Sequence, residues 1–104
     1  MDKMWDYTVS RSGATCTVNF SGELDISVRD DVVAVLASEL QRPGYDAVRA
    51  DLSAVSFLDS GGIAAFIKLR RDAEAAGRKF TIADPRGPVL RTLEITGVLP
   101  VLTS

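Results

Sequence analysis

The chain has 104 residues, 46% of them hydrophobic, and its 12 basic and 14 acidic residues give a formal net charge of −2. This length and composition predict a single domain over residues 1–104 with one core. No block of lysine and arginine is present, which disfavours nucleic acid and anionic membrane as partners. No apolar run could span a bilayer and no signal-peptide core begins the chain, so we expect a cytoplasmic protein.

Several classes of chemistry are excluded because the chain contains no histidine and only one cysteine, Cys16. Ser-His-Asp and Cys-His nucleophile systems and histidine-bearing zinc sites cannot form within it, and we expect neither an enzyme nor a bound metal. The segment 58–62 superficially resembles the nucleophile elbow of hydrolases, but Leu58 replaces the first glycine and no general base is available. Cys16 occupies an apolar position of an alternating segment, which favours core packing over reactivity.

The first elements expected are a β-hairpin and a helix. Apolar residues alternate over residues 5–9 and 14–20, on either side of an Arg-Ser-Gly turn, which predicts the hairpin. Ser27 and Asp30 resemble a capping box and predict that a helix begins near Ser27. The helix would present one apolar stripe, made of Val28, Val32, Leu36 and Leu40.

The second half of the chain predicts alternating strands and helices. We expect a strand over residues 47–52, a helix over 61–76 and a strand over 79–83. A third helix would follow and run through Glu94, and residues 99–102 could form a short last strand whose proline suits a sheet edge. This succession implies right-handed parallel crossovers and an α/β fold.

The most informative segment is 51–63, where a buried strand and a short turn lead to Ser60 at the start of a helix. The pair Asp59-Ser60 is a natural N-cap, because either side-chain oxygen can accept a hydrogen bond from the first helical turn. Gly61 and Gly62 follow and leave the neighbouring amides unscreened by side chains. Taken alone, such a pair is most often only a helix cap.

The whole segment 51–63 resembles the signature of the STAS domain, as found in bacterial anti-sigma factor antagonists. Segments 22–25, 77–80 and 89–98 also agree with the family, so the resemblance covers nearly the full chain. The fold it implies is α/β, a STAS-type mixed sheet of four to five strands with an N-terminal hairpin and three helices packed mainly on one face.

The resemblance also implies a regulatory site. Ser60 matches the serine that such antagonists have phosphorylated, and Asp59 matches the acidic residue before it. Asp25 matches the acidic residue of the Gly-Glu-Leu-Asp turn, although by itself it could be a turn or cap residue. The expected surroundings of the switch are Asp25, Ser27, Asp59, Gly61 and Gly62.

Two departures from the family pattern are visible. Gly61 stands where the family commonly has a second serine or threonine, which removes a rival hydroxyl beside Ser60. Many relatives have a further helix after the last strand, and we expect no counterpart of that helix or of any partner surface on it.

The resemblance implies a switchable binding module and not an enzyme. With Ser60 unmodified, an antagonist binds an anti-sigma factor and frees the sigma factor, which regulates transcription. The implied partner is a serine kinase that uses ATP and magnesium, so this chain itself would need no cofactor. A serine phosphatase acting on phosphorylated Ser60 would reset the switch.

Two other functions remain open. Similar domains serve as scaffold or sensory subunits of stress-signalling or transport assemblies. A small phosphate-bearing ligand could also be held at the Gly61-Gly62 helix start, since exposed amides and the helix dipole favour anions. The carboxylate of Asp59 opposes this last function by its charge.

Overall fold

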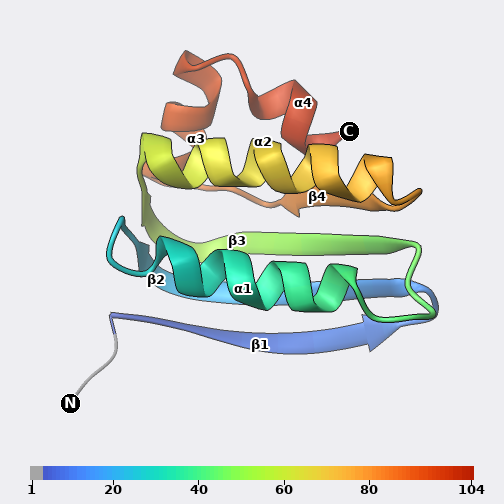
Figure 1. Cartoon of the computed structure of the whole chain (residues 1–104). Coiled ribbons are helices and arrows are strands. Elements are labelled where there is room, and N and C mark those ends of the chain that lie inside the picture. The colour runs from blue at the N-terminus through green and yellow to red at the C-terminus, as the bar shows by residue number, and fades with distance from the viewer. Residues whose placement is uncertain (1–3) are drawn as a thin grey trace.

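A four-stranded mixed sheet in the order β1-β2-β3-β4 forms the base of the fold (Figure 1). The computed structural model describes residues 4–104. β1 and β2 form the expected antiparallel hairpin, and β2, β3 and β4 are parallel neighbours. The elements in chain order are β1 (Trp5–Ser12), β2 (Thr15–Leu24), α1 (Arg29–Leu40), β3 (Ala47–Leu58), α2 (Ser60–Ala75), β4 (Lys79–Ala83), α3 (Gly87–Ile95) and α4 (Leu99–Thr103).

The core lies between one face of the sheet and the helices, because side chains alternate between the two faces of each strand. Figure 1 shows α1 and α2 on the same face, with α3 and α4 beside α2 at the β4 edge. The opposite face carries polar side chains such as Asn19, Arg49 and Asp51. The α/β fold with helices mainly on one face is therefore confirmed. Its most deeply buried side chains include Val18, Phe20, Leu36, Leu52, Phe66, Phe80, Leu93 and Leu102.

β3 is longer than predicted, because it continues through Leu58 without the turn expected after residue 52. The register against β2 shifts twice, and each shift inserts one extra residue on the β3 side. Such bulges break strict alternation, which is why this half of the strand does not show a simple period of two. Ser53 and Phe57, for example, are both exposed. The strand ends at Leu58, and α2 begins two residues later at Ser60.

The start of α1 differs from the prediction. The helix begins at Arg29 with Val28 as its N-cap residue, and no side chain caps it. The Ser27 hydroxyl instead donates to Asp25 Oδ1 at 2.6 Å. The predicted capping box of Ser27 with Asp30 is therefore wrong, because the preceding aspartate has taken the serine hydroxyl into a turn of its own.

The end of the chain is helical where a strand was predicted. Residues Leu99–Thr103 form α4, so the fold has four helices instead of three, and the expectation that no further helix follows was wrong. Pro100 suits the first turn of a helix as well as it suits a sheet edge, because the amides there need no partner within the helix. Leu102 is fully buried and anchors α4 to the core. Among the helices of residues 4–104, none combines the length and apolar character required to cross a membrane.

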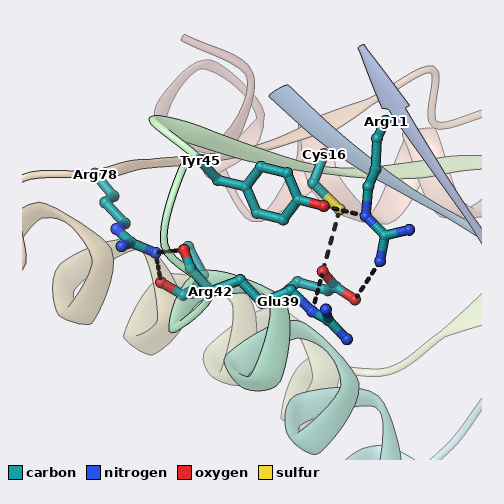
Figure 2. A network of polar contacts seen from close by, with 7 residues as sticks. Arg11, Cys16, Glu39, Arg42, Tyr45 and Arg78 are labelled. Carbon is teal, nitrogen blue, oxygen red and sulfur yellow. Dashed lines mark hydrogen bonds and ion pairs between the residues drawn. The ribbon is translucent and has the colours of Figure 1, made fainter. Parts of the chain in front are cut away.

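A buried carboxylate joins the hairpin to α1 at the end of the sheet where β2 begins (Figure 2). Glu39 lies 3.2 Å from Arg42 Nε and 3.6 Å from Arg11 Nη2, and the Cys16 thiol donates to it at 3.6 Å. Arg11 also donates to the hydroxyl of Tyr45. These partners offset the cost of burying the charge, so we assign the cluster a structural role. Cys16 is fully buried, as predicted.

Candidate functional site

Ser60 is the first residue of α2, and its side chain is exposed. The N-cap residue is Asp59, whose extended backbone turns the chain out of β3 and whose Oδ1 accepts a hydrogen bond from Gly62 N–H at 2.8 Å. Asp59 therefore supplies the cap that the sequence allowed either residue to supply. Because Asp59 caps the helix, the Ser60 hydroxyl stays exposed at the start of α2, where another protein can reach it.

Asp25 lies at the same end of the sheet as Ser60. Leu24 and Leu58 are register partners on β2 and β3, so Asp25 and Asp59 directly follow two paired residues. The acidic and hydroxyl groups that follow these two strands therefore form a rim around Ser60, because β2 and β3 are neighbours. Ser27, which donates to Asp25, belongs to the same rim.

The Asp25 carboxylate accepts two hydrogen bonds at Oδ1, from the Ser27 hydroxyl at 2.6 Å and from Ser27 N–H at 2.9 Å. These bonds favour the ionised form and lower the pKa of Asp25 below its ordinary value, the hydroxyl being the larger cause. Asp25 is therefore held as an anion in a fixed turn.

The glycine of the Gly-Glu-Leu-Asp turn fixes the end of β2. Gly22 has φ +90°, which side-chain-bearing residues rarely adopt, and a Cβ there would overlap the carbonyl oxygen of Met4. The close approach lets Glu23 N–H donate to that same oxygen at 2.9 Å. The backbone leading to Asp25 is thereby tied to the start of the hairpin.

Arg29 also belongs to this region, although no sequence pattern indicated it. It is the first residue of α1, and its Nη1 lies 2.9 Å from the point that a Cβ on Gly61 would occupy. Arg29 and Gly61 line a shallow hollow between α1 and α2, together with Lys68. No local pattern links residue 29 to residue 61, so only the packing of the two helices reveals the contact.

Replacing Ser27 with alanine should raise the pKa of Asp25 toward its ordinary value, because the stronger of its two hydrogen bonds is lost. The pKa is measured by NMR titration of the side-chain carboxyl carbon, with Ser10→Ala on β1 as the control. A depressed folded-state pKa stabilises the fold above the unfolded pKa, and that stabilisation is lost as pH falls through the folded value. The part of the stability difference between Ser27→Ala and wild type that comes from Asp25 should therefore vanish in acid. An unchanged Asp25 pKa in Ser27→Ala would contradict the assignment.

Comparison with known families decides the classification. The model of the STAS domain matches residues 7–103 of the chain. The chain belongs to the STAS domain family. The family resemblance expected from segment 51–63 is thus confirmed, and Ser60 lies where this STAS domain passes from its third strand to its second helix.

Solved structures share the fold of this STAS domain. The anti-sigma factor antagonist SpoIIAA in its unphosphorylated form has a TM-score of 0.78 at 18% identity, over 95% of this chain and 86% of that one. The phosphorylated form of the Bacillus cell fate determinant SpoIIAA has a TM-score of 0.71 at 18% identity, and the match covers 95% of this chain and 89% of that one. An anti-sigma factor antagonist from Mycobacterium paratuberculosis has a TM-score of 0.74 at 24% identity, and the match covers 94% of this chain and 82% of that one.

The same fold also occurs inside a much larger protein. The murine Slc26a9 anion transporter matches with a TM-score of 0.73 at 22% identity, over 88% of this chain but only 15% of the transporter chain. At such identities the likeness concerns the fold alone. What this STAS domain does must therefore be argued from its own residues.

Proposed function

We propose that this STAS domain is an anti-sigma factor antagonist that is switched by phosphorylation of Ser60 in the bacterial cytoplasm. Unmodified, it would bind an anti-sigma factor that is a serine kinase and so release the sigma factor for transcription. ATP and magnesium would belong to the kinase. A serine phosphatase would return the phosphorylated form to the binding state.

The exposed hydroxyl of Ser60 at the mouth of α2 is the observation that carries this proposal. Asp59 performs the capping, so Ser60 has no required structural task there. A kinase could bring the hydroxyl oxygen to the γ-phosphorus of ATP. The new O–P bond would form as the bond to ADP breaks, and the hydroxyl proton would be released.

The two other functions have weaker support. A small phosphate ligand at the start of α2 would need the Gly62 amide, which already donates to the Asp59 carboxylate. A scaffold role in a stress-signalling or transport assembly agrees with the likeness to the transporter domain but gives the exposed Ser60 no task. The phosphorylation-switched antagonist is therefore the function best supported by the site.

Incubation with ATP, magnesium and the kinase recovered on the immobilised domain should add one phosphate per chain, measured by intact-protein mass spectrometry. Ser60→Ala should abolish the addition, because the acceptor oxygen is gone. Ser56→Ala, which removes another exposed hydroxyl near the end of β3, should be modified like wild type. Equal modification of wild type and Ser60→Ala would refute Ser60 as the switch.

A further inference from the structure

The backbone conformation at residue 61 does not require glycine, because the φ angle of Gly61 lies outside the positive range that favours glycine. What the missing side chain provides is space. A Cβ at this position would lie 2.9 Å from Arg29 Nη1 and 3.4 Å from Asp59 Oδ1. The first of these separations is too short for a real contact, so a side chain at residue 61 would displace the guanidinium of Arg29.

The guanidinium of Arg29 is only weakly engaged by its neighbour. Its Nε lies 3.9 Å from Asp30 Oδ1, and the Asp30 side chain is 98% exposed, so water screens this pair strongly. Among the described residues, Arg29 forms an ion pair with Asp30 and none with the nearby carboxylate of Asp59. Arg29 thus keeps donor capacity for an anion, and its Nη1 faces the residue that follows Ser60.

We propose that Arg29 positions the phosphate on Ser60, its guanidinium donating to the phosphate oxygens across the space that Gly61 leaves open. This inference rests on the proposed phosphorylation of Ser60. Guanidinium groups match phosphate oxygens with two parallel hydrogen bonds, which fix direction as well as distance. The phosphate would therefore be held toward the start of α1, and the modified site would have one defined shape for a phosphatase to recognise.

The test uses the whole 104-residue chain with phosphoserine installed at position 60 during translation, so it needs no kinase. A ³¹P NMR titration gives the second pKa of the phosphate, which is about 6 for an exposed group. A neighbouring cation favours the dianion, and Arg29→Gln should raise this pKa by about 0.5 to 1 unit. Gly61→Ala should raise it as well, because the new methyl group pushes the guanidinium aside without adding a hydrogen-bond donor. Arg29→Lys should retain part of the effect.

Lys68→Gln is the matched control, since Lys68 lines the same hollow but pairs with Asp72 at 2.9 Å. It should leave the phosphate pKa at the wild-type value. An identical phosphate pKa in wild type, Arg29→Gln and Gly61→Ala would overturn the inference, as would an equal shift in Lys68→Gln. Because the phosphoserine is installed directly, this outcome is separate from the kinase experiment, whose failure would instead refute the proposed function.

Discussion

Phosphorylation of Ser60 should weaken binding to the proposed anti-sigma factor partner about a hundredfold while the domain stays folded. The phosphate adds about −1.5 to −2 charges at neutral pH. Arg29 can offset part of this, but Asp25 and Asp59 already place negative charge at the same end of the sheet. A loss of about 3 kcal/mol gives a hundredfold change, and one misplaced, desolvated charge at an interface can supply it.

Calorimetric titration of the anti-sigma factor with unmodified and phosphorylated protein measures the effect, with circular dichroism recorded on the same samples. Ser60→Asp should weaken binding by less than phosphate does, because one carboxylate carries less charge and has shorter reach. Ser12→Asp adds the same charge at the end of the sheet opposite to Ser60, where β1 ends beside the first residue of β2. This variant should bind like wild type. Equal affinity of the two forms, or a loss accompanied by collapse of the helical signal, would refute the mechanism.

The largest expected loss of stability comes from Phe66→Ala, at about 3 to 5 kcal/mol. The Phe66 side chain is 1% exposed and its ring centroid lies 6.0 Å from that of Phe80, so α2 is anchored to β4 by this pair. Truncation removes buried apolar surface and leaves a cavity that the sheet cannot fill. Chemical denaturation followed by circular dichroism measures the loss.

Phe57 provides the matched control for Phe66. It is 46% exposed on β3, so Phe57→Ala deletes the same atoms without opening a buried cavity. Its cost should stay below about 1 kcal/mol. Similar losses for the two variants would mean that α2 does not pack in the register described here.

The sequence predicted the elements in which local pattern and final packing agree. Val18 and Phe20 alternate with polar residues and face the core, and Phe66 follows helical spacing, so both kinds of element were recognised. The position of Ser60 was also predictable, because the switch from strand to helix and the Asp59 cap are local features. The family resemblance added a predicted role for Ser60 that periodicity alone does not provide.

The predictions that were wrong failed because of tertiary packing or because another side chain competed for the same hydrogen bond. Ser27 matches a capping pattern, but Asp25 competes for the same hydroxyl. Leu99 and Val101 alternate like a strand, yet the burial of Leu102 draws the segment into a helix. Arg29 could not be assigned to the site, because its contact with Gly61 depends on how α1 and α2 pack.

Because Cys16 is completely buried, its reactivity toward a thiol reagent reports how often the core opens. Burial, reinforced by the Glu39 carboxylate, raises the pKa of the Cys16 thiol, so little reactive thiolate is present at neutral pH. A water-soluble thiol reagent can therefore modify it only in molecules where the core beneath α1 has opened. Cys16 is the chain's single cysteine, so its modification rate measures how often that opening occurs. If this rate changes when phosphoserine is installed at position 60, the effect of that modification extends to the far end of α1.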